Sequence, residues 1–472
     1  MTASSTPSFP TILQMAEDLR AGRTTPTQLA QEALRRLGSD GVRLNAVVTL
    51  TPDLAMQDAA RAEAELVAGR DRGPLHGIPY GAKDLLSAAG IPTSWGAAPL
   101  RDQVFDHDAT VVHRLREAGA VLVGKLAMVE LAGGFGYDQP NAALTGPGRN
   151  AWNPDRWAGG SSSGSGAAVA AGAVPFAIGS ETWGSITTPA AFNGITGLRP
   201  TYGRVSRHGA MALSWTMDKI GPMALTAEDC AVVLDAIAGH DPYDLTTSGR
   251  SSDLAIEPPA AGWRFGALRG ATTAVSPEVA ANYEASLQVL RTFGSVEEVE
   301  LPDLPYDAAA TMIITCEAAS AFEEFLQDGL ASELTAPEDR VSLYAVLSVP
   351  AVDYLRALRV RRLATRALDA VIAPYDVIVA PTLALVATPI DADFTTAFHG
   401  ERGPSLGAAG NLCGLPSITI PNGAGEGGLP TGLEFLGRAF DEPKILAVAK
   451  AFQAKTDFHQ YHPTMMPAGD HD

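Results

Sequence analysis

Cysteine is scarce in this sequence of 472 residues. The three cysteines, Cys230, Cys316 and Cys413, lie far apart and form no CxxC pair. This spacing excludes a disulfide framework and the paired ligands of a structural zinc site. We therefore expect three buried, reduced thiols.

Basic residues are also few. Only 34 Lys and Arg stand against 53 Asp and Glu, so the formal net charge is -19 and the pI is about 4.9. Such a chain gains no affinity for a polyanion through counterion release, and we expect no nucleic-acid partner. Charged residues make up 18% of the chain and hydrophobic residues 46%, a balance that excludes an intrinsically disordered protein.

Long hydrophobic runs are missing as well. The longest weakly polar stretch, residues 164–179, is interrupted by Pro175 and is too short to span a membrane. The N-terminal segment has neither the basic region nor the apolar stretch that a signal peptide needs. These features predict a cytoplasmic protein without membrane contact.

What the sequence does contain is an alternation of helical patterns with short apolar strands. Thr25 and Gln28 form a capping box before a helix, and further helices are expected at 110–118, 226–239 and 277–292. Strand candidates are 120–123, 263–268, 377–380, 417–420 and 433–436. With no visible linker, this alternation predicts an α/β protein: a single large α/β/α sandwich with a mixed, twisted central sheet covered by helices.

The densest signal for chemistry is the glycine- and serine-rich segment 157–200. A glycine-rich loop before a helix can bind phosphate, but this one has neither the Gly-Lys-Ser/Thr ending nor a GxGxxG pattern with a later acidic residue. Gly160 to Gly164 also matches G-x-S-x-G, with Ser162 as nucleophile and His399 as its partner. The residues before it lack the strand that such an elbow requires. This alternative stays open at the level of sequence.

Lys83 stands in the otherwise apolar segment 77–86. A lysine is rarely buried without a partner, and burial lowers its proton affinity so that the neutral amine can act as a base. Taken alone, a lysine in such a segment is more often an ordinary one, whose side chain extends its ammonium group to the surface.

Together these segments resemble the amidase signature family, whose hydrolases use a serine–cis-serine–lysine triad. The resemblance covers nearly the whole chain, and we place a single domain of this type at 8–465, with flexible termini at 1–7 and 466–472. The matching segments, in the family's order, are 77–86, 159–171, 179–190, 193–207, 411–416 and 432–437.

The resemblance implies three catalytic roles. Ser185 is the nucleophile that forms the acyl-enzyme, Ser161 is the bridging serine next to a cis peptide bond, and Lys83 is the base. A serine hydroxyl needs such a base to become an effective nucleophile. The family's mechanism requires no metal and no organic cofactor.

The turn before Ser185 supplies the oxyanion hole if the resemblance holds, through the backbone N–H groups of Thr182, Trp183 and Gly184. The turn also departs from the family pattern. Glu181 replaces an aspartate, Trp183 a glycine and Thr187 an arginine. A large side chain and the loss of a cation beside the nucleophile affect substrate choice rather than the triad, and they disfavour a strongly anionic substrate.

Segment 128–137 resembles the stretch that borders the acyl pocket in the family. The substrate-binding candidates are Met128, Gly133, Gly134, Phe135, Trp183 and Arg204. Packing in the core is the alternative for the first four, packing behind the turn for Trp183, and a structural ion pair for Arg204 and for nearby Arg207.

The resemblance thus predicts an amidase that hydrolyses aryl or alkyl amides, with esters and carbamates as further substrates. The chain is expected to act on small molecules as a monomer or homodimer. The alternatives are an amidase subunit of a glutamine-dependent amidotransferase complex, and a non-catalytic binding protein on the same fold. Intact Lys83, Ser161 and Ser185 argue against the last.

Overall fold

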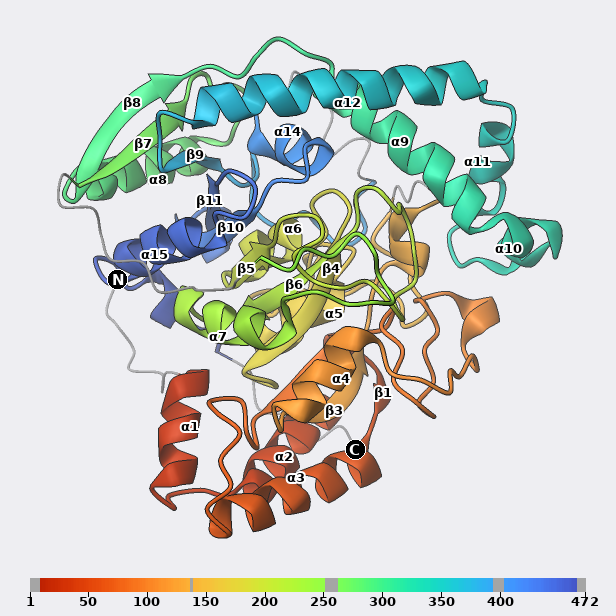
Figure 1. Ribbon diagram of the computed structural model, residues 1–472, viewed down its shortest axis with the longest axis vertical. Helices are drawn as coiled ribbons and strands as arrows, with labels where there is room; N and C mark the ends of the chain where they lie inside the picture. The colour runs from red at the N-terminus through yellow and green to blue at the C-terminus, as the bar shows by residue number, and fades with distance from the viewer. Residues whose placement is uncertain (1–8, 136–138, 251–261, 394–402, 465–472) are drawn as a thin grey trace.

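A computed structural model describes residues 9–135, 139–250, 262–393 and 403–464 (Figure 1). At its centre lies one 11-stranded sheet with the strand order β1-β3-β2-β4-β6-β5-β10-β11-β9-β7-β8. The strands are β1 (Val47–Leu50), β2 (Pro79–Lys83), β3 (Val121–Leu126), β4 (Phe176–Glu181), β5 (Thr196–Arg199), β6 (Lys219–Ala224), β7 (Trp263–Leu268), β8 (Gly294–Val299), β9 (Val377–Pro381), β10 (Ser417–Ala424) and β11 (Pro430–Leu436).

Helices surround the sheet. The α-helices are α1 (Ile12–Arg20), α2 (Pro26–Arg36), α3 (Pro52–Val67), α4 (Thr110–Glu117), α5 (Ser163–Ala170), α6 (Thr187–Asn193), α7 (Ala227–Ile237), α8 (Pro277–Leu290), α9 (Tyr306–Ala321), α10 (Glu323–Gln327), α11 (Asp339–Val346), α12 (Ala351–Ile372), α14 (Leu406–Leu412) and α15 (Glu442–Gln453). Short helical turns are η1 (Leu37–Gly41), η2 (Ala98–Leu100), η3 (Glu130–Gly133), η4 (Leu330–Glu333), η5 (Glu426–Gly428) and η6 (Phe458–Gln460).

The sheet is mixed and buried. Strand β2 runs parallel to β3 and β4, and β7 runs parallel to β8 and β9, whereas the other neighbours are antiparallel. Every residue of β2, β3, β6, β9 and β11 is buried, so helices must cover both faces. Helices α7 and α15 pack together on β6 and β10, and α5 and α6 pack together on β4 and β5. The predicted α/β class with a mixed sheet is confirmed.

The local signals in the sequence formed the expected elements. The Thr25 hydroxyl accepts from the Gln28 N–H at 3.2 Å, and the Gln28 side chain accepts from the Thr25 N–H at 3.1 Å, which is the predicted capping box. The expected helices became α2, α4, α7 and α8. The strand candidates became β3, β7, β9, β10 and β11.

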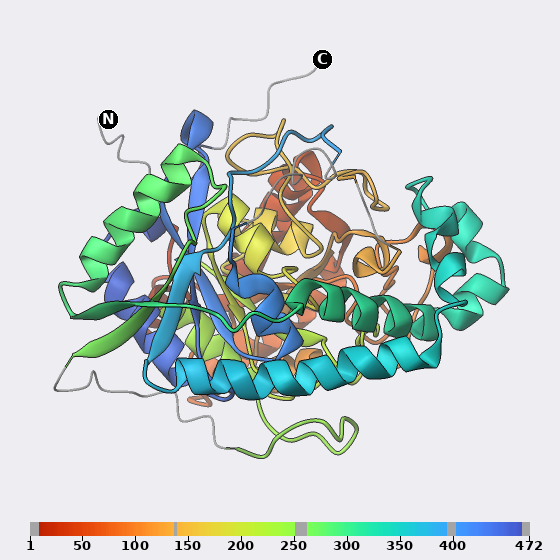
Figure 2. The same cartoon turned by 90° about the horizontal axis from the view of Figure 1, so that it is seen from above.

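A helical arm, residues 306–372, extends away from the sheet. Figure 2 shows α9 and α12 side by side, with α10 and α11 at the far end of the arm. The apolar patterns considered above did not indicate this arm. It matters for the site because α9 and α11 supply part of a cavity wall.

Three further expectations concern the chain as a whole. Cys230 and Cys413 are buried as expected, whereas Cys316 is half-buried, and all three are free thiols. Among the described residues no single helix is long and apolar enough to cross a membrane, although α11 and α12, bent by 92°, meet that criterion when joined. The predicted flexible termini, 1–7 and 466–472, lie outside the described residues, as does His399.

Candidate active site

Lys83 ends β2, a strand that is buried along its whole length. Its Nζ donates to the Ser161 hydroxyl at 2.7 Å and to the Ser180 hydroxyl at 2.9 Å, and lies 3.4 Å from the Ser180 carbonyl. The side chain is fully buried. The alternative for Lys83, an ammonium group that reaches solvent, is therefore ruled out.

The hydrogen-bond partners of Lys83 are neutral oxygens, and burial is the main influence on the pKa of its amine. Burial lowers the pKa of Lys83 to about 7, against a weaker opposing influence of Asp218 and Glu181. Lys125 is equally buried and lies 3.1 Å from a carboxylate oxygen of Asp84, and burial lowers the pKa of its amine as well. Near neutral pH, Lys83 is therefore divided between a neutral and a charged form.

Ser161 lies in the loop that leads into α5. The peptide bond between Gly160 and Ser161 is cis, next to the serine as the resemblance implied. The Ser161 carbonyl accepts from the Val129 N–H at 3.1 Å, and the Ser161 hydroxyl is the one that Lys83 contacts. Gly159 has φ +81° and abuts the backbone of Pro189, so a side chain at Gly159 would be strained and would clash with that backbone.

Ser185 lies in the turn between β4 and α6. The Ser162 N–H donates to the Ser185 carbonyl at 3.2 Å, which joins this turn to the Ser161 loop. Ser185 is 5% exposed and lines a cavity of about 290 Å³. Gly184, directly before it, has φ +83°, a conformation that glycine adopts without strain.

Glu181 holds the turn that contains Ser185 through hydrogen bonds to its carboxylate. Its Oε2 accepts from the N–H groups of Ile186 and Thr187 at 2.9 and 3.0 Å and from the Thr187 hydroxyl at 3.2 Å. Its Oε1 accepts from Arg199 at 2.9 Å and from Asn411 at 2.8 Å. The two departures from the family pattern, Glu181 and Thr187, therefore contact each other. The buried Glu181 carboxylate accepts from the neutral Thr187 hydroxyl, and its counter-charge is Arg199 at the end of β5.

The charge of Glu181 is maintained in the interior. Burial by itself raises the pKa of this carboxyl, but Arg199, Lys219 and the Thr187 N–H outweigh burial and bring the pKa to about 2. Lys219 also donates to the Thr182 carbonyl at 3.2 Å and to Asn411 at 2.9 Å. Burial lowers the pKa of Lys219 well below its ordinary value, so the ionised pair that supports the turn at Ser185 is Glu181 with Arg199.

The cavity at Ser185 contains four of the six predicted substrate-binding residues, namely Gly133, Gly134, Phe135 and Trp183. No motif in the sequence pointed to the remainder of the wall. Helices α9 and α11 contribute the apolar side chains of Ile314, Leu343 and Val346 from more than a hundred positions further along the chain.

Two predicted pocket residues lie elsewhere. Met128 is 1% exposed and belongs to the core. Arg204 is buried, with its Nε 3.7 Å from the Glu442 carboxylate and its guanidinium 5.9 Å from the centre of the Phe440 ring. Arg204 is thus a structural ion-pair partner, because the loop after β5 turns it toward α15.

Ser162, the alternative nucleophile, is fully buried. Its hydroxyl donates to the Ser180 carbonyl at 3.2 Å and accepts from the Ser180 N–H at 3.3 Å. These bonds tie the start of α5 to β4. This position leaves the Ser162 hydroxyl inside the sheet–helix packing, and Ser162 is not among the residues that line the cavity at Ser185.

Comparison with known proteins identifies the family of the chain. The family model named Amidase matches residues 28–446. A glutamyl-tRNA(Gln) amidotransferase subunit of Roseiflexus sp. (strain RS-1) is 39% identical, over 96% of this chain and 98% of the relative. The native peptide amidase of Stenotrophomonas maltophilia is 36% identical with a TM-score of 0.83, over 94% of this chain and 96% of that structure.

A bacterial aryl acylamidase of the amidase signature family is 24% identical and has the same fold, with a TM-score of 0.82 over 97% of this chain and 99% of that structure. The whole described fold, and not only the motifs around Ser185, therefore has counterparts among these enzymes. The chain belongs to the amidase signature family and is a hydrolase that acts on carbon–nitrogen bonds.

Proposed function

We propose that this protein hydrolyses aryl or alkyl amides of carboxylic acids through a covalent acyl group on Ser185. Ser161 bridges the proton transfer and Lys83 is the terminal base. The observation that carries the proposal is the 2.7 Å contact between Lys83 Nζ and Ser161 Oγ in a fully buried setting, with a Lys83 pKa of about 7.

In the acylation step, Ser185 Oγ attacks the amide carbonyl carbon. The Ser185 proton moves to Ser161 Oγ as the proton of Ser161 moves to neutral Lys83. Collapse of the tetrahedral intermediate breaks the C–N bond, and the proton returns from Lys83 through Ser161 to the leaving nitrogen. Water then attacks the acyl-Ser185 ester with the same base, which releases the acid and regenerates the serine.

The negatively charged oxygen of each tetrahedral intermediate requires hydrogen-bond donors. The backbone N–H groups of Thr182, Trp183 and Gly184 form no hydrogen bond with another described residue, which leaves them available for an oxyanion. Loss of one such donor typically slows a reaction by about 10²- to 10³-fold. Esters and carbamates present the same carbonyl geometry and would react by the same steps.

The lining of the Ser185 cavity supports an apolar acyl group. Phe135, Trp183, Leu343 and Val346 surround it, and no described lysine or arginine lines it. Substrates with small or medium apolar acyl chains fit this lining better than dicarboxylic acids do.

A second candidate is the amidase subunit of a glutamine-dependent amidotransferase. The identity of 39% to the Roseiflexus amidotransferase sequence favours it. The apolar cavity with Trp183 favours the independent amidase, because glutamine carries two charged groups that need polar partners. An amidotransferase subunit would be nearly inactive when purified alone and would copurify with its partner subunits. The proposed independent amidase is active as a monomer or homodimer.

The test combines labelling with turnover. Wild type, Ser185→Ala and the matched control Ser162→Ala are treated with a fluorophosphonate, analysed by intact mass and assayed with a chromogenic anilide. We expect one label and hydrolysis in wild type and in Ser162→Ala, and neither in Ser185→Ala. Loss of labelling only in Ser162→Ala would support the elbow alternative, and an inactive wild type would favour the amidotransferase component.

A further inference from the structure

A second cavity, of about 200 Å³, adjoins the one that contains Ser185. The two cavities share Ala132, Thr182 and Leu213 in their walls. A substrate bound with its amide group at Thr182 therefore has one part in the apolar cavity and the other in the second cavity. The direction of proton transfer decides which cavity binds the acyl part of the substrate and which binds the leaving group.

The second cavity lies on the lysine side of the site. Ser180 is in its wall, and the Ser180 hydroxyl accepts from the same Lys83 Nζ that contacts Ser161. Because the leaving nitrogen must receive its proton from Lys83 through Ser161, the leaving group belongs on this side. The acyl part then occupies the apolar cavity.

Aromatic rings border the second cavity and are partly open to solvent. Trp215 is 45% exposed and Tyr243 is 77% exposed. The Tyr243 ring stacks on His208 with centroids 5.0 Å apart and planes 26° apart. Three aromatic side chains around one small cavity provide flat surfaces for another ring, whose edge and face interactions add to simple burial.

The backbone beneath these rings is fixed before any ligand arrives. The Trp215 carbonyl accepts from Arg207 and, at 2.7 Å, from the Tyr202 hydroxyl. The Tyr243 N–H donates to Asp241 at 2.9 Å. Because these positions are already ordered, little conformational entropy is lost when a ligand ring packs against them.

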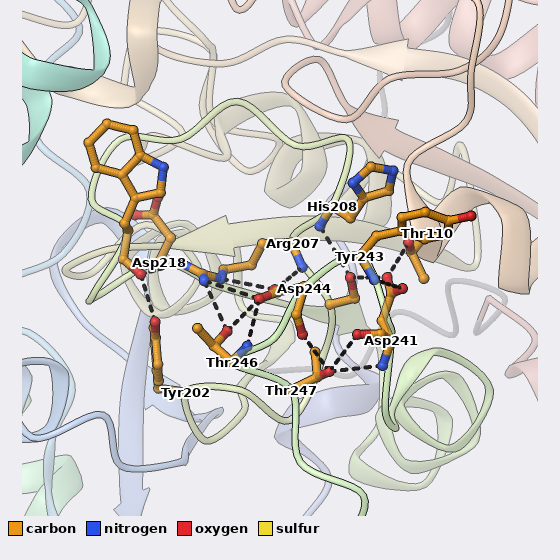
Figure 3. Close-up of polar contacts among 12 residues, drawn as sticks. Thr110, Tyr202, Arg207, His208, Asp218, Asp241, Tyr243, Asp244, Thr246 and Thr247 are labelled. Atoms are coloured by element: carbon orange, nitrogen blue, oxygen red, sulfur yellow. Dashed lines mark hydrogen bonds and ion pairs between the residues drawn. The ribbon is translucent and has the colours of Figure 1, made fainter.

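The charges in the second cavity are satisfied internally (Figure 3). The Arg207 guanidinium binds the Asp244 carboxylate at 3.3 Å and the Thr246 hydroxyl at 3.0 Å. Asp218 accepts from the Thr182 hydroxyl at 2.6 Å and from two backbone N–H groups at 2.9 Å. A carboxylate on the ligand would meet two carboxylates and a cation that is already paired, so this cavity disfavours an anionic group.

We propose that the second cavity binds the leaving group and selects uncharged aromatic amines, which makes N-aryl amides the preferred substrates. The proposal rests on the acyl-Ser185 mechanism and names the substrate class of the same site. A volume of about 200 Å³ lies below the usual range of about 300–1,000 Å³ for drug-sized ligands, so one ring fits better than a large leaving group.

The experiment measures kcat/KM for acetyl amides that share the acyl group and differ in the amine, namely 4-nitroaniline, 4-aminobenzoate and propylamine. Wild type is compared with Trp215→Ala, Tyr243→Ala and the control Tyr461→Ala, which removes an exposed tyrosine outside both cavities. Thermal unfolding verifies that each variant is folded.

We expect wild type to favour the nitroanilide over the aminobenzoate, and each cavity variant to lower the nitroanilide-to-propylamide ratio by roughly three- to tenfold. The control should leave this ratio within twofold of wild type. A ratio unchanged in both cavity variants, or equal rates for the nitroanilide and the aminobenzoate in wild type, overturns the proposal.

Anilides with acyl chains of different length distinguish the roles of the two cavities. If Trp215→Ala changes the preference between acetyl and hexanoyl anilides and not the preference between amines, the second cavity binds the acyl group and the proposal fails, while the acyl-Ser185 mechanism stands. A wild-type protein that is not labelled at Ser185 overturns both.

Discussion

If Lys83 is the base, as proposed above, its burial sets the pH dependence of the reaction. Its pKa is about 7, in place of 10.5 for an ordinary lysine. With that value the neutral fraction is about 1% at pH 5, about half at pH 7 and about 99% at pH 9. We therefore expect kcat/KM to rise about tenfold per pH unit below pH 6 and to level off above about pH 8.

The plateau distinguishes this arrangement from a solvent-exposed lysine. Between pH 7 and pH 9 a group with a pKa of about 7 gains only about twofold in its neutral form, whereas a group with a pKa of about 10.4 gains about a hundredfold. The assay is kcat/KM for a nitroanilide from pH 5 to 10, because this quantity reports the free enzyme. The rate of fluorophosphonate labelling at Ser185 should follow the same curve.

A substitution tests the electrostatic cause. Asp218 raises the pKa of Lys83 through its negative charge, so Asp218→Asn should move the inflection of the profile to lower pH. The control Tyr461→Ala should leave the inflection in place. A rate that is flat from pH 6 to 10, or one that still climbs tenfold between pH 8 and 9, would refute the assignment of Lys83 as the base.

Three substitutions test the scaffold by urea-induced unfolding. Glu181→Gln leaves the buried Arg199 cation without its nearest carboxylate and should lower the free energy of unfolding by about 3–5 kcal/mol. An unchanged midpoint would contradict the role of Glu181 in holding the turn that contains Ser185. Gly164→Ala places a methyl group 2.3 Å from the Ala46 carbonyl oxygen and should cost about 1–3 kcal/mol. If Gly164→Ala is as stable as wild type, helix α5 can shift to relieve this clash. Thr25→Ala removes a capping bond and should cost about 0.5–2 kcal/mol with no effect on activity, and a loss of turnover would be unexpected.

Much of the architecture was predictable because its signals are local. A capping box and a short apolar run each act over a few residues, and the structure contains the corresponding helix and strands. The motif order around Lys83, Ser161 and Ser185 likewise indicated the family, which the comparisons confirmed.

The cavity walls were predictable only in part. Gly133, Gly134 and Phe135 lie near the predicted motif, but the side chains from α9 and α11 reach the cavity through the helical arm, whose docking depends on the whole chain. Arg204 shows the reverse case. It is close in sequence to the site motifs, yet the loop after β5 turns it toward Glu442.

The sequence by itself determined the α/β class, the residue types of the proposed triad and the departures in the turn before Ser185, because these depend on composition, order and short-range patterns. The tertiary structure alone decided the proton affinity of Lys83 and the shape of the two cavities. Both depend on burial and on partners distant in the chain: the hydroxyl groups of Ser161 and Ser180 meet Lys83 across 78 and 97 positions. Only folding brings those groups together and excludes water from them.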